Sequence, residues 1–167
     1  MPADYKDIVE WFGPGEFSPF LGLFVPGIEN PATELRAMAK SFTRSLGSIL
    51  PIQPRVPYGV FPAPGGLLAW GSSENGGLFF WETSPEIPDS WRVVAVESGW
   101  RDIFIYDGGI GDFLVSLFEG RLEIPFIGAL NEDIDEEFDE IEVLEFRPND
   151  GTFPPAGRLE AIGRFED

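Results

Sequence analysis

Three stretches of the chain repeat apolar residues at the three- to four-residue spacing of an amphipathic α-helix. The first is preceded by Asp4, a candidate N-terminal cap, and is followed by Gly13 as a stop signal. The second begins at Asn30-Pro31, where a capping side chain comes before proline at the first helical position, and Gly47 marks its expected end. The pattern therefore predicts helices over residues 5–12, 30–47 and 110–118.

Shorter apolar runs, rich in β-branched and aromatic residues, predict the strands of a sheet. The Asn75-Gly76 pair between two of these runs is a strong signal for a hairpin turn. The predicted strands cover residues 21–25, 67–71, 78–83, 91–97, 103–106 and 141–147, while residues 158–165 fit either a strand or a helix. Because short turns join successive strands, the sequence predicts a single α+β domain built on a mainly antiparallel sheet, with the helices packed against it.

Residues 51–65 are rich in proline, and Pro51, Pro54 and Pro57 follow one another at the three-residue repeat of a polyproline II helix. Such a repeat can dock on an aromatic groove of a partner. A stiff connector or edge segment that covers the sheet is the simpler interpretation, and it is the one we expect.

The composition is that of a folded globular protein with a core of large rings. Hydrophobic residues make up 43% of the 167 residues and aromatic residues 14%, which is enough to fill such a core. No apolar run approaches the ~20 residues of a membrane-spanning helix, and the first residues do not form a secretory signal. We therefore expect a cytoplasmic protein with no membrane partner.

The absence of two residue types restricts the catalytic and metal-binding sites that the chain can form. The chain has no histidine and no cysteine, so it cannot form a Ser-His-Asp triad, a cysteine nucleophile, a disulfide or the usual zinc site. Its net charge of −18 opposes direct binding to nucleic acid, which requires lysine and arginine against the phosphates. The same charge attracts basic proteins over long range.

The most distinctive local feature is an acidic run between Arg121 and Arg147 that contains no basic residue. Its nine carboxylates equal half of the net charge, and apolar residues such as Ile134 and Phe138 interrupt them. A solvated loop of like charge is one interpretation, but the apolar interruptions favour an ordered surface that binds a basic protein. The predicted partner-binding residues are Glu132, Asp133, Asp135, Glu136, Glu137, Asp139, Glu140 and Glu142.

Part of the same run matches the ligand spacing of a calcium-binding EF-hand loop. The matching residues are Asn131, Asp133, Asp135, Asp139 and Glu142, at loop positions one, three, five, nine and twelve. Position six is Glu136, although the sharp turn of such a loop requires glycine there. We therefore expect no metal site in the chain, and no cofactor.

A series of short motifs follows one another along most of the chain. They are Pro2-Ala3-Asp4-Tyr5-Lys6, Phe12-Gly13-Pro14-Gly15-Glu16-Phe17, Trp70-Gly71, Gly77-Leu78-Phe79-Phe80-Trp81, Trp91-Arg92-Val93-Val94 and the Phe113-Leu114 helix. In this order they resemble the SUKH superfamily over residues 2 to about 118, and we interpret residues 121–167 as an acidic C-terminal extension of the same domain. Five motif residues are interpreted as structural, the glycines in turns and the tryptophans in packing or at the rim of a groove: Gly13, Gly15, Trp70, Trp81 and Trp91.

The resemblance implies a binding function rather than an enzymatic one, because members of this superfamily share no catalytic residues. Bacterial members are mostly immunity proteins that bind and neutralise toxins, often nucleases, and fungal relatives are scaffold-like regulators of cell-wall synthesis. The first hypothesis is therefore an immunity protein that occludes a basic cognate toxin, and the second is an interaction module in a regulatory assembly. The third, an acid–base enzyme such as a glycosidase, requires two carboxylates that face each other across a cleft.

Overall fold

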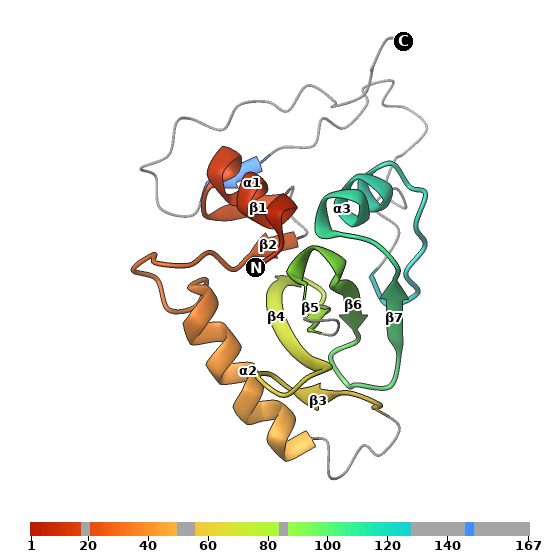
Figure 1. The fold of residues 1–167 in the computed structure, drawn as a ribbon. Coiled ribbons are helices and arrows are strands. Elements are labelled where there is room, and N and C mark those ends of the chain that lie inside the picture. Colours follow the sequence, from red (N-terminus) through yellow and green to blue (C-terminus); the bar gives the residue numbers. More distant parts are fainter. Residues whose placement is uncertain (18–20, 50–55, 84–86, 128–145, 149–167) are drawn as a thin grey trace.

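A sheet with helices on both faces forms the framework of the protein (Figure 1). The computed structural model describes residues 1–17, 21–49, 56–83, 87–127 and 146–148. The helices of these ranges are α1 (Ala3–Phe12), α2 (Leu35–Ile49), α3 (Ile110–Phe118) and the short 3-10 helix η1 (Pro88–Ser90). The strands are β1 (Gly15–Phe17), β2 (Leu21–Leu23), β3 (Gly59–Val60), β4 (Gly66–Ser73), β5 (Leu78–Glu82), β6 (Arg92–Val96), β7 (Ile103–Tyr106) and β8 (Phe146–Pro148). This arrangement confirms the predicted α+β class with a mainly antiparallel sheet.

The main path of the sheet has the strand order β7-β6-β5-β4-β2-β1-β8, and every pair along it is antiparallel. β4 pairs with β5 along one edge, and its other edge is shared by β2, at residues 71–73, and β3, at residues 66 and 67. The β3–β4 pair is parallel. Because β8 pairs with β1, the last strand of the described chain lies beside the first (Figure 1).

The centre of the core is β5, where Phe79, Phe80 and Trp81 are fully buried. Side chains alternate along a strand, so Phe79 and Trp81 point to one face of the sheet and Phe80 points to the other. On the first face Trp81 meets Tyr5 of α1, with ring centroids 4.8 Å apart. On the second face Phe80 meets Phe42 of α2 at 5.8 Å. α1 and α3 therefore cover one face of the sheet, and α2 covers the other (Figure 1).

The short strands β1 and β8 are held by a second group of rings. Phe17 and Phe146 are register partners, and their ring centroids lie 5.1 Å apart. Phe12 of α1 and Phe118 of α3 pack on Phe17 at 5.2 and 5.5 Å. The contacts that define these two strands thus come from distant parts of the chain.

The first turn of α1 differs from the prediction. Pro2, not Asp4, occupies the position before the helix, and Asp4 lies inside the first turn. The carboxylate of Asp4 accepts hydrogen bonds from the backbone N–H groups of Tyr5 and Gly111, at 2.7 and 3.0 Å. Asp4 thus ties α1 to the first turn of α3. The predicted end of the helix at Gly13 is confirmed, since this residue adopts a φ of 70°.

The boundaries of α2 also differ from the prediction. The helix begins at Leu35 rather than Pro31, and it continues past Gly47. Asn30 caps a turn ahead of the helix instead, because its side chain accepts a hydrogen bond from the backbone N–H of Ala32 at 3.0 Å. The Asn-Pro signal was therefore correct as a cap but was assigned to the wrong turn.

Most of the remaining predicted elements are confirmed. β2 lies within the predicted strand 21–25, β4 to β7 match the four predicted strands between residues 67 and 106, and α3 matches 110–118. The described part of the proline-rich segment contributes β3 to the sheet, as expected of an edge segment, whereas Pro51 and Pro54 lie outside the described residues. Of the predicted strand 141–147 only the last two residues are described, within β8, and residues 158–165 lie outside.

Glu34 is the N-terminal cap of α2. Its carboxylate accepts hydrogen bonds from the backbone N–H groups of Ala37, at 2.7 Å, and Gly27, at 3.2 Å. Burial alone would raise the pKa of Glu34, but these hydrogen bonds outweigh it and lower the pKa. The ionised carboxylate therefore holds the loop before α2 against the first turn of the helix.

The pH dependence of stability tests this cap. Because the pKa of Glu34 is lower in the folded state, its contribution is present above the unfolded pKa of ~4.3 and is lost as the pH falls through the folded value. We expect Glu34→Gln to lower the free energy of unfolding by about 0.5–2 kcal/mol at pH 7, and by less as the pH falls below ~4. Chemical denaturation across this range is the measurement, with Glu29→Gln, at an exposed position of the same loop, as the control. A difference that does not change with pH would show that the charge of Glu34 is not what stabilises the cap.

Gly66 and Gly47 give a matched pair of tests for the packing at the β3–β4 turn. A Cβ on Gly66 would lie 2.5 Å from the backbone nitrogen of Phe61 and 2.6 Å from the carbonyl carbon of Val60, so the turn must shift to admit it. We expect Gly66→Ala to lower the free energy of unfolding by about 1–3 kcal/mol. Gly47→Ala meets no heavy atom within 4 Å and should raise this free energy by about 0.5–1 kcal/mol, the usual gain in helix propensity. Urea denaturation measures both changes, and equal effects of the two substitutions would contradict this packing.

Candidate functional site

The acidic run that the sequence predicts as a partner-binding surface, from Glu132 to Glu142, lies outside the described residues. The EF-hand-like spacing within it lies there too. Of the predicted C-terminal extension, the structure describes residues 121–127 and β8. The binding role of the acidic run therefore stays a prediction, and the site described below is built from other residues.

The motif residues fall into two groups. Gly13 is the C-terminal cap of α1, and Gly15 is the first residue of β1. Trp70 and Trp81 are fully buried with ring centroids 6.1 Å apart, so they belong to the core. Trp91 is only half-buried; its ring packs 6.2 Å from that of Trp81, and it lines a pocket. Of the three tryptophans, Trp91 is therefore the one that rims a groove.

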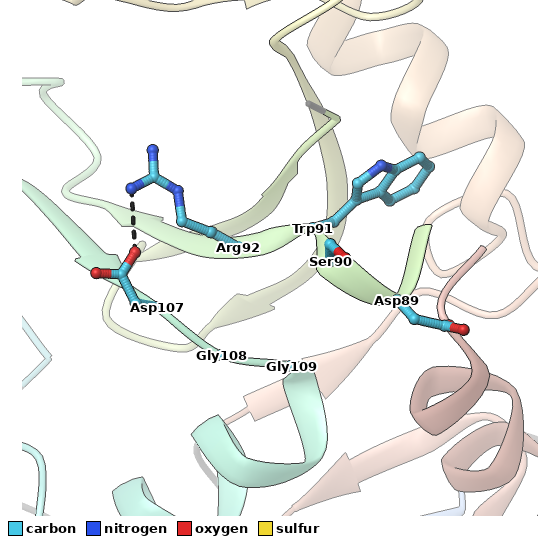
Figure 2. A pocket seen from close by; sticks show the side chains of 7 residues that line it. All are labelled: Asp89, Ser90, Trp91, Arg92, Asp107, Gly108 and Gly109. Carbon is cyan, nitrogen blue, oxygen red and sulfur yellow. Dashed lines mark hydrogen bonds and ion pairs between the residues drawn. The ribbon is translucent and has the colours of Figure 1, made fainter. Parts of the chain in front are cut away.

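The pocket beside Trp91 is small and open, with a volume of about 230 Å³ (Figure 2). One wall consists of the end of η1 and the start of β6, and the other consists of the turn between β7 and α3. Figure 2 shows Asp89 and Asp107 on opposite sides of it, with Arg92 beside Asp107. The residues that line the pocket are Asp89, Ser90, Trp91, Arg92, Asp107, Gly108 and Gly109.

Arg92 connects three neighbouring strands at the edge of the pocket. It is the register partner of Glu82 across the β5–β6 pair, and its Nε and Nη2 donate hydrogen bonds to Glu82 Oε2 at 2.9 and 2.5 Å. Its Nη1 donates to Asp107 Oδ1, just after β7, at 3.0 Å. The hydrogen bonds with Asp107 and Glu82 raise the pKa of Arg92, so the guanidinium stays cationic.

Tyr58 is a second group whose titration Glu82 affects. Burial and the negative charge of Glu82 raise the pKa of Tyr58, so its hydroxyl stays protonated.

Both walls of the pocket are attached to the first turn of α1. On one wall Asp89 accepts a hydrogen bond from the backbone N–H of Ala3 at 2.7 Å. On the other wall Asp4 binds the N–H of Gly111, and a Cβ on Gly109 would collide with the Asp4 carboxylate. The shape of the pocket thus depends on glycine at position 109 and on the docking of α1.

The charge balance of the pocket favours a cationic ligand group. The guanidinium of Arg92 is already paired with Glu82 and Asp107. Asp89 is exposed, and the Asp107 side chain is still 82% exposed despite its pair with Arg92. The general acid of a glycosidase instead occupies an enclosed apolar setting that keeps it protonated. An ammonium or guanidinium group is the ligand chemistry that this pocket suits.

The described ranges contain neither a metal-binding cluster nor a membrane-spanning helix. No group of three or more acidic side chains in these ranges could hold a metal ion. None of the helices in the same ranges combines the length and the apolar character needed to cross a bilayer.

Comparison of the chain with protein-family models, with curated proteins and with solved structures gives no match in any of the three.

Sequence reasoning singled out Trp91 but missed the ion pairs around Arg92. These pairs depend on strand register, because Glu82 and Arg92 lie at the two strand ends that face each other across the β5–β6 connection. Alternation along the two predicted strands places both residues on one face, and this was the signal that could have found the pair.

A double-mutant cycle tests the clamp formed by Arg92. Removing the guanidinium leaves Glu82, whose side chain is only 16% exposed, without its cation. We expect Arg92→Met to lower the free energy of unfolding by about 1–3 kcal/mol, and the double variant with Glu82→Gln to recover at least ~0.5 kcal/mol of it. Arg121→Met, which breaks an exposed pair with Glu119, should change stability by less than about 0.5 kcal/mol. Urea denaturation provides the comparison, and an Arg92 effect as small as that of Arg121 would contradict the clamp.

Proposed function

We propose that this protein is an immunity-type binding protein that neutralises a cognate bacterial toxin by direct binding and occlusion. The observation that carries the proposal is the separation of an aromatic core from an acidic surface, in a chain of net charge −18. The exposed carboxylates of the described residues are Asp7, Glu10, Glu29, Glu74, Asp89, Asp102, Asp107, Asp112, Glu119 and Glu123. A surface of this sign attracts and steers a basic protein. Nuclease toxins are the first class to test, because a protein that binds nucleic acid needs a basic cleft.

The titration behaviour of the described side chains supports binding rather than turnover. Every resolved side-chain pKa shift moves away from neutral pH: downward for Glu34 and Glu97, and upward for Tyr5, Tyr58 and Arg92. A general acid or base works best when its pKa lies near the operating pH. These groups are instead held in one protonation state, as structural hydrogen-bonding groups are.

The resemblance to the SUKH superfamily supports the same proposal. The residues that carry it occupy or adjoin α1, β1, β4, β5, β6 and α3. These elements include the strands around Trp81 and the two helices, α1 and α3, that cover its face of the sheet. An interaction module in a regulatory assembly is the alternative, and it predicts a partner without toxicity.

Co-expression with each toxin-like protein that the neighbouring genes encode tests the function. We expect the wild-type chain to restore growth and to form a complex with one such protein in pull-down. Charge reversal of Asp135, Glu136 and Asp139 to Lys should slow association strongly and leave the fold intact. The matched control is the same charge change at three other exposed positions, Glu29, Glu74 and Glu123.

The outcomes separate the hypotheses. If the wild type neither rescues growth nor forms a complex, the immunity function is wrong. A complex without rescue favours the interaction module. If the reversed variant associates as fast as its control, immunity stands but the acidic run is not the interface.

A further inference from the structure

The outer side of α1 presents a tryptophan to solvent. Trp11 is 82% exposed, the highest value among the large hydrophobic residues of the described chain that lie at the surface. The inner side of the same helix buries Tyr5 and half-buries Ile8, Val9 and Phe12 against the core. The core therefore does not require an aromatic residue at position 11.

Three sources of negative potential lie near Trp11. Asp7 lies one turn before it on the same side of the helix, and Glu10 is its neighbour; both carboxylates are exposed. The last turn of α1 contains no basic residue, so the partial negative charge of the helix C-terminus is not offset there. The face of an indole ring adds its own attraction for cations. All three effects favour the same ligand group, a cation.

The helix that carries this ring is held firmly. The Tyr5 hydroxyl donates a hydrogen bond to the backbone carbonyl of Phe24, and Asp4 binds the N–H of Gly111 at 3.0 Å. Asp89 accepts a hydrogen bond from Ala3 at 2.7 Å. Because α1 is fixed to the residue that follows β2, to α3 and to η1, a side chain that docks on Trp11 meets a preorganised surface.

We propose that Trp11, Asp7 and Glu10 form a docking surface for a basic protein, with an arginine or lysine of the partner stacked on the indole ring near the carboxylate of Asp7 and within the negative potential of Glu10. This inference rests on the proposed function and identifies the anchor of its interface. Tryptophan is among the residues most enriched at binding hot spots, where a large apolar contact excludes water around a charged pair. A second copy of the chain is disfavoured as the occupant, because it has the same net charge of −18.

Binding of a purified toxin-like protein identified by this co-expression tests the surface, measured by biolayer interferometry. We expect Trp11→Ala to raise the dissociation constant about 30-fold, the usual loss of affinity at a hot spot, mainly through faster dissociation. The apolar control is Ile105→Ala, an exposed position on β7. Asp7→Asn/Glu10→Gln should slow association several-fold at low salt, whereas the control Glu29→Gln/Glu74→Gln, with the same change in charge, should slow it less.

Two further measurements exclude indirect effects. The urea midpoint of Trp11→Ala should equal that of the wild type, because the removed ring is exposed. The wild type should be as monomeric as the variant in size-exclusion chromatography with light scattering. A wild-type dimer that Trp11→Ala dissociates would overturn the proposal in favour of a self-association surface.

The failure of this inference and that of the proposed function are distinguishable. If the wild type does not bind the toxin-like protein, both are wrong. If the wild type binds it and Trp11→Ala binds equally well, the function stands and the Trp11 surface is overturned. Trp11→Phe, which keeps an aromatic face, should retain more affinity than Trp11→Ala, and equal losses in the two variants would count against stacking of a cation.

Discussion

The whole fold depends on covering both faces of β5. Because Phe79 and Trp81 project to one face and Phe80 to the other, a single layer of helices cannot bury this strand. Burying one tryptophan removes 150–250 Å² from water, which is worth about 4–6 kcal/mol at ~25 cal/mol per Å². The indole N–H groups of Trp70 and Trp81 have no hydrogen-bond partner within the described part of the chain, and each such donor costs about 1–3 kcal/mol. Apolar burial is therefore the larger effect, and it explains why the core keeps both rings.

An apolar core of this kind restricts charged groups to its margins, where a few of them stabilise the ends of strands through hydrogen bonds. Arg92 joins β5, β6 and β7 at one end of the sheet. At the other end the Glu97 carboxylate accepts a hydrogen bond from the N–H of Gly99 at 2.8 Å, within the turn that places Trp100 at a φ of 59°. The Trp100 ring then lies 5.5 Å from that of Phe80 and helps to close the second face. Carboxylates such as Asp7 and Glu10, which face solvent, are left for other roles.

The predictable elements were those whose signal is local. The four consecutive strands between residues 67 and 106 and the helix after them show their own periodicity and turns, and the structure has all five. β1 and β8 have three residues each and are stabilised by pairing with strands distant or adjacent in the sheet, so β1 was missed and β8 was predicted only through the end of the run 141–147. The start of α2 is set by Glu34, through a hydrogen bond to Gly27 in the preceding loop, and not by the Asn-Pro signal. The candidate site was predicted only at Trp91, because its ion pairs depend on register and its shape on the docking of α1.

Acidity and binding are coupled through the stability of the fold. Like charges on a molecule of net charge −18 repel one another, and the unfolded chain relieves this repulsion by spreading them apart. A basic partner neutralises part of the repulsion only in the folded state, where the binding surface exists, so its binding stabilises the fold by mass action. Long-range attraction would set the association rate of such a partner, whereas the Trp11 ring on the anchored helix α1 would set its dissociation rate. The charge that destabilises the free protein would thus stabilise the proposed complex, and this balance suits the proposed binding function.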